Sequence, residues 1–194
     1  MLVLAFWFAI TIPPVDEGSR DPSFAKFRAE LSAAFDRRDR PFVESALAQD
    51  ANLSFGGHTG VRAFREMYPP GKEPWAKWRR MISLGGRWRR GGFEGPYVFT
   101  DFPRELDEFS FGVSIDERVS VRLTPSPLAD VVDFLNWETF EYLDNLRGEW
   151  TLVRTPRNRE GYVRSESVWS PIDFRIRFEK RNGVWKIAFW LQGD

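Results

Sequence analysis

The first half of the chain carries apolar residues at three- and four-residue spacing, which predicts four short helices between residues 21 and 86. The first begins where Asp21, an N-cap residue, is followed by Pro22 at the first helical position. Its inward face carries Phe24, Phe27, Leu31 and Phe35. Similar signals predict a second helix from Asp39, a third around residues 61–68 and a fourth around residues 75–84.

Three shorter segments accompany these helices. The stretch ANLSFGG, residues 51–57, predicts a short strand that ends at two glycines. The stretch RWRRGGFEG, residues 87–95, has the composition of a loop. The stretch PYVFTDFP, residues 96–103, predicts another strand, which ends at a proline because proline cannot donate to a sheet.

From Glu117 onward the pattern changes to short alternating runs separated by Pro, Asn or Gly, and it predicts the five small strands of a barrel. The last run, residues 172–192, has apolar residues on both arms of an Asn182-Gly183 turn and predicts a β-hairpin. A hairpin this apolar is not stable by itself, and a closed barrel has no free edge to receive it. We therefore expect the hairpin to pair with earlier strands, around Leu53 and Val98.

The chain opens with an unbroken apolar run from Leu2 to Ile10, which is shorter than the roughly 20 residues of a membrane span. The run resembles the apolar region of a secretory signal, although no Lys or Arg precedes it and no Ala-x-Ala site follows. The pattern favours a periplasmic or other extracytoplasmic location. The alternative is a cytoplasmic protein whose N-terminal segment packs on its body. We expect membrane contact only through this segment.

Composition narrows the possible chemistry. The 194 residues are 16% aromatic and 29% charged, which is typical of a packed globular protein. The absence of cysteine excludes disulfides and thiolate nucleophiles, and a single histidine, His58, excludes a cluster of histidine ligands. Formal net charge is zero, so nucleic acid is not an expected partner of the whole chain. We expect no cofactor and no metal site.

Four features follow one another between residues 117 and 169. They are a VSVR strand with a Pro-Ser turn, an apolar strand, a strand containing Trp, and a Gly-Tyr-Val sequence. The residues are Val119, Val121, Arg122, Pro125, Ser126, Val131, Val132, Leu135, Trp150, Val153, Gly161, Tyr162 and Val163. In this order the segment resembles a bacterial SH3-like (SH3b) domain. It departs from the family at Ser120, where Asn is usual, and at Asn136-Trp137, which replace a turn glycine.

The SH3b resemblance implies a five-stranded barrel with Trp150 in its core and exposed aromatics that hold a peptide or a peptidoglycan fragment. The candidate ligand-binding residues are Trp137, Tyr142 and Trp169. The early helices, the SFGG segment and the C-terminal hairpin are similar to the NTF2-like, SnoaL-type fold, which implies a pocket under a curved sheet. That shape serves enzymes and binding domains alike.

The expected fold class is therefore α+β, a helical and curved-sheet NTF2-like domain with an inserted five-stranded SH3-like β-barrel. The apolar leader and linker would occupy residues 1–20, the α+β domain residues 21–115 plus 170–194, and the barrel residues 116–169. The barrel would thus interrupt the domain that contains the last hairpin.

Catalytic groups are few. His58 lies in a glycine-rich loop, and the carboxylate pairs Asp36/Asp39 and Asp107/Glu108 stand where helix caps and turns are expected. Three functions remain open: a non-enzymatic binding or scaffolding protein of the cell envelope, an NTF2-like small-molecule enzyme that uses His58 or a buried Asp, and a binder of an anionic polymer. The polymer binder would use the Arg/Trp segment 75–90. This segment lies within residues 62–90, which contain nine basic and two acidic residues.

Overall fold

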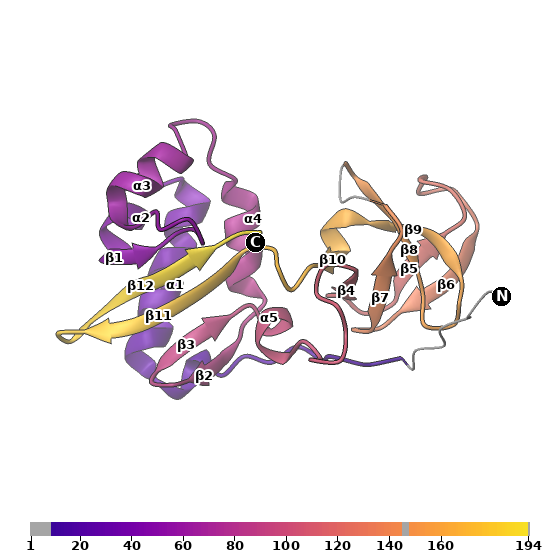
Figure 1. Ribbon diagram of the computed structural model, residues 1–194, viewed down its shortest axis with the longest axis horizontal. Helices are drawn as coiled ribbons and strands as arrows, with labels where there is room; N and C mark the ends of the chain where they lie inside the picture. Colours follow the sequence, from indigo (N-terminus) through magenta and orange to yellow (C-terminus); the bar gives the residue numbers. More distant parts are fainter. Residues whose placement is uncertain (1–8, 145–147, 194) are drawn as a thin grey trace. The chain divides into compact units, whose positions relative to one another are not determined.

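The computed structural model describes residues 9–144 and 148–193, which form an α+β protein with two compact units (Figure 1). Unit 1 contains residues 9–14 and 101–171, and unit 2 contains residues 15–100 and 172–193. Each unit has its own sheet. Unit 2 is discontinuous in sequence because unit 1 separates its first 86 residues from its C-terminal hairpin.

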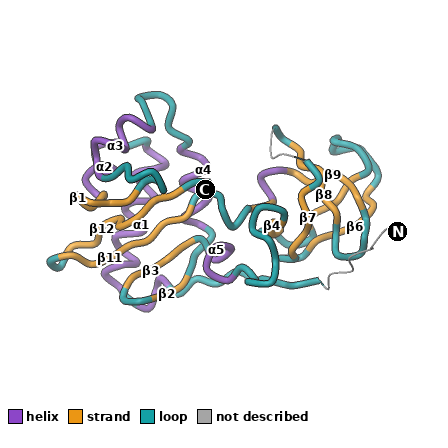
Figure 2. The backbone as a smooth tube through the Cα atoms, viewed as in Figure 1, coloured by secondary structure: helices purple, strands orange, loops and turns teal. Residues whose placement is uncertain are grey.

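Unit 2 places helices against a five-stranded sheet (Figure 2). Its helices are η1 (Gly18–Arg20), α1 (Pro22–Arg37), α2 (Arg40–Ala46), α3 (Gly60–Met67), α4 (Trp75–Ser83) and α5 (Tyr97–Asp101). Its strands are β1 (Leu47–Asn52), β2 (Arg87–Arg89), β3 (Gly92–Gly95), β11 (Arg175–Arg181) and β12 (Val184–Leu191). The strand order is β1-β12-β11-β3-β2, with β1 parallel to β12 and the other pairs antiparallel.

The four predicted helices are confirmed, and local signals explain where two of them begin. The Asp21 side chain accepts hydrogen bonds from the backbone N–H groups of Ser23 and Phe24 at the start of α1. Asp39 does the same for Phe42 at the start of α2. The pairing of the C-terminal hairpin with strands from before residue 112 is also confirmed, because β12 lies beside β1 and β11 beside β3.

Three local predictions are wrong. Residues 87–95 form the β2–β3 hairpin, whose turn residues Arg90 and Gly91 have φ values of 48° and 76°, in keeping with the twist of a two-residue hairpin. Residues 97–101 form α5, in which the Pro96 carbonyl accepts from the N–H groups of Phe99 and Thr100, so Val98 is not in a strand. The predicted strand at 51–57 instead begins at residue 47 and ends at residue 52.

Aromatic rings fill the interior of unit 2. Phe24 of α1 lies between 4.6 and 5.3 Å, ring centre to ring centre, from four rings of the sheet: Trp88, Phe93, Phe178 and Trp185. A second cluster surrounds Trp78 of α4, which is 0% exposed. Its members are Phe35, Phe64, Tyr68, Trp75, Phe174 and Trp190.

Unit 1 is built on an antiparallel seven-stranded sheet. Its strands are β4 (Phe111–Ser114), β5 (Val119–Arg122), β6 (Val131–Leu135), β7 (Thr139–Tyr142), β8 (Trp150–Arg154), β9 (Glu160–Arg164) and β10 (Val168–Trp169), with the short helix η2 (Ser165–Ser167) before β10. The order is β10-β4-β7-β8-β9-β5-β6. One buried cluster in its core contains Val119, Val121, Leu135, Phe140, Val153, Val163 and Val168.

The prediction of a closed five-stranded barrel is therefore wrong. The five strands within residues 117–169 are present as β5 to β9, but β4 and β10 extend the same sheet, and β6 and β10 remain its two ends in the described part of the chain. Gly112 lets β4 pack closely on β7, since a Cβ there would lie 2.3 Å from the Tyr142 hydroxyl oxygen. The sequence pattern misses β4 because this strand precedes the alternating region and is only four residues long.

The described end of the predicted leader also belongs to unit 1. The Ile12 N–H donates to the Trp137 carbonyl at 2.7 Å, and the Thr139 N–H donates to the Ile10 carbonyl at 2.9 Å. Ile12 is 4% exposed. Residues 2–8 of the apolar run lie outside the described residues. In the described ranges, no helix combines the length and apolar character that crossing a bilayer requires.

Candidate binding groove on unit 1

Unit 1 carries a groove of about 240 Å³ that brings together residues from separate parts of its sequence. Residues 116–122 supply one wall, and the others come from the 123–130 loop, β8, β9 and η2. The lining residues are Asp116, Glu117, Arg118, Val119, Ser120, Arg122, Pro127, Trp150, Arg164 and Ser167. The groove therefore combines one large aromatic ring with three guanidinium groups and two carboxylates.

Trp150 lies on the outward face of β8. Thr151 and Val153 point into unit 1 and are buried, whereas Trp150 and Leu152 alternate with them and remain partly exposed. The prediction that Trp150 lies in the core is therefore wrong. An outward indole in a groove is available to pack against a ligand.

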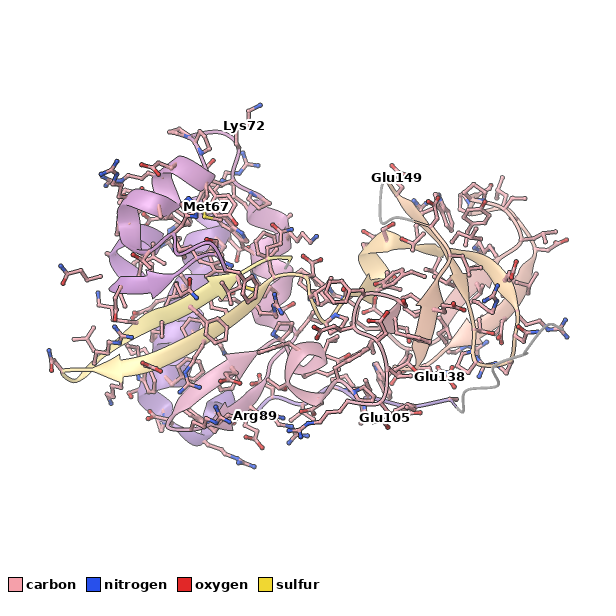
Figure 3. All side chains as sticks on the ribbon, viewed as in Figure 1. Met67, Lys72, Arg89, Glu105, Glu138 and Glu149 are labelled. Atoms are coloured by element: carbon pink, nitrogen blue, oxygen red, sulfur yellow. The ribbon has the colours of Figure 1, made fainter. Side chains whose placement is uncertain are left out.

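Arg164 covers this indole from the neighbouring strand. The two residues are directly paired across β8 and β9, and the guanidinium carbon of Arg164 lies 4.3 Å from the Trp150 ring centre, a cation–π contact. Arg164 also donates to the Glu149 carboxylate at 3.0 Å; Glu149 is labelled in Figure 3. The Glu149 side chain is 82% exposed, so the ion pair that holds Arg164 is solvated and weak.

Two further arginines of the groove have no carboxylate partner among the described residues. Arg122 is partly buried and donates through Nη1 to the Ala129 carbonyl at 2.7 Å. Arg118 is exposed, and its guanidinium carbon lies 4.9 Å from the Phe134 ring centre. A guanidinium carries five N–H donors, so both groups keep donors for a ligand.

The three aromatics predicted to bind a ligand are placed elsewhere in unit 1. Trp137 is partly exposed in the turn between β6 and β7, where its φ is 52°. Tyr142 is partly buried on β7, with its ring centre 5.0 Å from that of Phe140. Trp169 is 5% exposed, so the expectation that it is an exposed aromatic is wrong. None of the three lines the groove, and ligand binding by them stays a prediction.

His58 lies in the exposed loop between β1 and α3. Its Nδ1 is 2.9 Å from the Ser54 hydroxyl oxygen, which also accepts the His58 backbone N–H at 3.2 Å. These bonds close a local turn of five residues, and among the residues that the structure describes none links the ring to a carboxylate that would orient it as a base. Within the residues that the structure describes, no group of three or more His, Asp or Glu side chains could hold a metal ion.

The close carboxylate pairs serve local structure. Asp39 caps α2, and Asp36 accepts from Arg79 of α4 at 3.2 Å. Asp107 accepts from the backbone N–H of Phe109 and from the Ser110 hydroxyl, and these bonds lower the pKa of its exposed carboxyl, the Ser110 hydroxyl having the largest effect. A carboxyl held as an acceptor in a turn is not placed as a general acid.

Unit 2 has a shallow cleft of about 410 Å³ at its surface, lined by Arg38, Gly71, Glu73, Pro74, Trp75, Ala76 and Lys77. The Glu73 carboxylate in this cleft is occupied by Arg40, which donates to it at 2.6 Å, and by the Gly71 N–H at 2.7 Å. Nearby Tyr68 has its pKa raised to about 12, mainly by burial and also by the Asp173 carboxylate. The phenol therefore stays protonated at neutral pH.

Two of the three tryptophans in the Arg/Trp segment 75–90 are held by the protein itself, whereas Trp75 is partly exposed and lines the cleft described above. Trp78 is 0% exposed, and the Trp88 ring N–H donates to the Glu17 carbonyl at 2.9 Å. Arg87 is 3.4 Å from the Glu17 carboxylate. Rings held in the core or against the backbone cannot stack on successive bases.

Comparison with protein-family models, curated proteins and solved structures gives no match to this chain. The groove on unit 1 is thus assigned from its own geometry.

Proposed function

We propose that this chain is a non-enzymatic binding protein whose unit 1 is an SH3b-like module that holds a peptide in the groove beside Trp150. The observation that carries the proposal is the outward indole of Trp150 in a groove of about 240 Å³, next to guanidinium groups with unused donors. Aromatic and arginine side chains are the residues that most often dominate binding energy at protein surfaces.

Two features support the SH3b resemblance within this proposal. The matched residues Val119, Val121, Val153 and Val163 belong to one buried cluster. The five strands of residues 117–169 also follow one another in the sheet as β7-β8-β9-β5-β6. An NTF2-like classification of unit 2 is part of the same proposal, supported by helices packed on a sheet that the C-terminal hairpin completes.

The filling of unit 2 favours binding over catalysis. An NTF2-like enzyme needs an open, polar-lined cone, whereas Phe24, Phe64 and Trp78 are each 0% exposed in the interior here. His58 is exposed in a loop, and its hydrogen bonds go to Ser54, four residues earlier. The enzyme alternative and the anionic-polymer alternative therefore have less support than the binding protein.

A location in the bacterial cell envelope belongs to the proposal and rests on the SH3b resemblance and the apolar run that opens the chain. The ligand class consistent with that location is a peptide, free or as part of a peptidoglycan fragment. Fractionation of cells that express the full chain tests the location: recovery entirely in the cytoplasm would contradict it.

The binding proposal is tested with purified full-length protein and two matched substitutions. Pools of capped hexapeptides and muropeptides are titrated by isothermal titration calorimetry, a readout that does not depend on the substituted tryptophans. We expect Trp150→Ala to weaken binding by about tenfold or more, as removal of a central aromatic anchor does. Trp137→Ala is the control, because Trp137 is also partly exposed in unit 1 but does not line the groove.

Either of two outcomes contradicts this site assignment. Loss of binding in Trp137→Ala with binding retained in Trp150→Ala would move the site to the aromatics predicted from sequence. Absence of binding by any peptide or muropeptide would remove the peptide-binding function itself.

A further inference from the structure

We propose that the groove selects peptides with a single acidic side chain beside apolar residues, and that Arg122 binds the carboxylate of that side chain. This inference rests on the proposed function, because it specifies the ligand of the same groove. It follows from which charges in the groove are already neutralised, from the pairing of the strands and from the apolar residues at the rim.

The state of the three arginines identifies the anion site. Arg164 is engaged with Glu149 and with the Trp150 ring. Arg122 is partly buried, and its side chain donates to the Ala129 carbonyl, which carries no net charge. A partly buried guanidinium without a carboxylate gains most from an incoming anion, since a charge-assisted bidentate pair replaces only partial hydration.

The groove also limits how much negative charge the ligand can carry. Glu117 lines the same groove and is exposed next to Arg118. Its fixed carboxylate would repel a strongly acidic segment or a polyphosphate, whereas a single ligand carboxylate directed at Arg122 meets a guanidinium that has no carboxylate partner among the described residues. The charge pattern therefore fits one acidic side chain rather than an anionic polymer.

The pairing of the strands bears on which groups can give specificity. β5 pairs with β6 along its length but with β9 only at Arg122 and Tyr162, and β8 pairs with β7 and β9. Main-chain hydrogen bonds are the same for every peptide sequence, so the choice among peptides depends on side-chain contacts. The groove supplies these contacts through the indole and the guanidinium groups.

Apolar residues at the rim indicate what flanks the acidic side chain. Pro127 lines the groove, and Leu128, the next residue, is 93% exposed. Leu123, at the other end of the same loop, is 59% exposed. Large apolar side chains this exposed beside a groove are typical of an interaction surface. A ligand with apolar residues next to its acidic residue would cover them.

The test is selection from random hexapeptides that are acetylated at the amino end and amidated at the carboxyl end, so that side chains are the only carboxylates. Full-length protein is the bait, and the selected peptides are compared with the input. We expect enrichment of peptides with one Asp or Glu. Replacing that residue by Asn or Gln in the best peptide should weaken binding by about tenfold, as loss of a charge-assisted hydrogen bond does.

Substitutions link this selectivity to Arg122. Arg122→Gln keeps a side-chain N–H for the Ala129 carbonyl, and it should abolish the difference between the acidic peptide and its amide analogue. Arg118→Gln, at an exposed position, should reduce the difference in part without affecting folding. Arg159→Gln is the control, because Arg159 is also exposed in unit 1 but does not line the groove.

The two proposals fail differently. This inference is overturned if the selected peptides are not enriched in acidic residues, or if Arg122→Gln leaves the preference for them unchanged. Weaker peptide binding in Trp150→Ala would then still support the groove as the binding site. Selection of no peptide at all overturns the proposed function, and this inference with it.

Discussion

Arg157 reaches from the turn between β8 and β9 to Asp133 of β6, where its Nε donates to both carboxylate oxygens, at 3.0 and 2.9 Å. The same guanidinium donates through Nη1 and Nη2 to Glu138, at 3.0 and 2.9 Å; Glu138 is labelled in Figure 3. Thr155 adds a hydroxyl donor to Asp133 at 2.7 Å. These bonds join the edge strand β6 to a turn that it does not contact through the backbone ladder.

This network predicts that Asp133→Asn destabilises the protein by about 1–3 kcal/mol, because a charged acceptor of several hydrogen bonds is lost. Urea unfolding at neutral pH measures the effect. Asp130→Asn is the matched control, since Asp130 is exposed nearby and is not part of the network around Arg157. Equal stabilities of the two variants would show that the network contributes nothing.

The same carboxyl predicts a pH dependence. Burial alone would raise the pKa of Asp133, but hydrogen bonds from Thr155 and Arg157 hold it below the usual value of an aspartate. A carboxyl with a lowered folded-state pKa contributes stability that is present above its unfolded-state pKa and is lost as the pH falls through the folded value. The deficit of Asp133→Asn should thus shrink below pH 4. A deficit that stays constant down to pH 3 would contradict the assignment.

Substitution of Phe140 should destabilise the protein much more than substitution of Trp150. Phe140 is 0% exposed in the core of unit 1, so Phe140→Ala should cost about 3–5 kcal/mol. Trp150→Ala removes an outward ring and its cation–π contact, which are worth about 1 kcal/mol. Thermal melting of both variants measures the difference. A larger loss of stability in Trp150→Ala than in Phe140→Ala would indicate that the Trp150 ring belongs to the core.

Trp78 tests the aromatic interior of unit 2. Trp78→Ala should destabilise by about 3–5 kcal/mol, because the ring is fully buried among other rings. Trp78→Phe should cost much less, since it also removes the indole N–H, which is buried without a hydrogen-bond partner. Chemical denaturation measures both, with Trp75→Ala, at a partly exposed site on the same helix, as the control. Equal losses for Ala and Phe would contradict the view that ring burial stabilises unit 2 at this position.

His58→Ala should leave stability within about 0.5 kcal/mol of the parent and leave peptide binding unchanged, because the ring lies in an exposed loop. Melting and the peptide titration provide the two measurements. A lost ligand signal with an unchanged melting temperature would instead make His58 part of a site and favour the enzyme alternative.

The helices could be predicted from sequence because their signals are local. Asp21-Pro22 and the Asp39 cap act on neighbouring N–H groups, and no distant contact is needed to specify them. The β2–β3 hairpin was missed because its Arg90-Gly91 turn lacks the usual Asn or Asp. The α5 helix was missed because aromatic and β-branched residues such as Tyr97 and Val98 favour strands when their surroundings are unknown.

The candidate site shows a different limit. Strand alternation places Trp150 and Val153 on opposite faces of β8, but both faces carry apolar residues, so the pattern does not say which face is buried. The groove also joins residues as distant as Arg118 and Arg164, which no single motif contains. The sequence therefore predicts the strands β5 to β9, whereas the groove requires the folded sheet.

The discontinuous sheet of unit 2 has a consequence during synthesis. Helices α1 and α4 leave the ribosome long before β11 and β12, which their aromatic side chains pack against. Translation from Asp101 to Leu191 takes roughly 5–18 s at about 5–20 residues per second. For that interval Phe24, Phe35 and Trp78 lack part of their cover, so the nascent chain is expected to be a chaperone client until its last strand emerges.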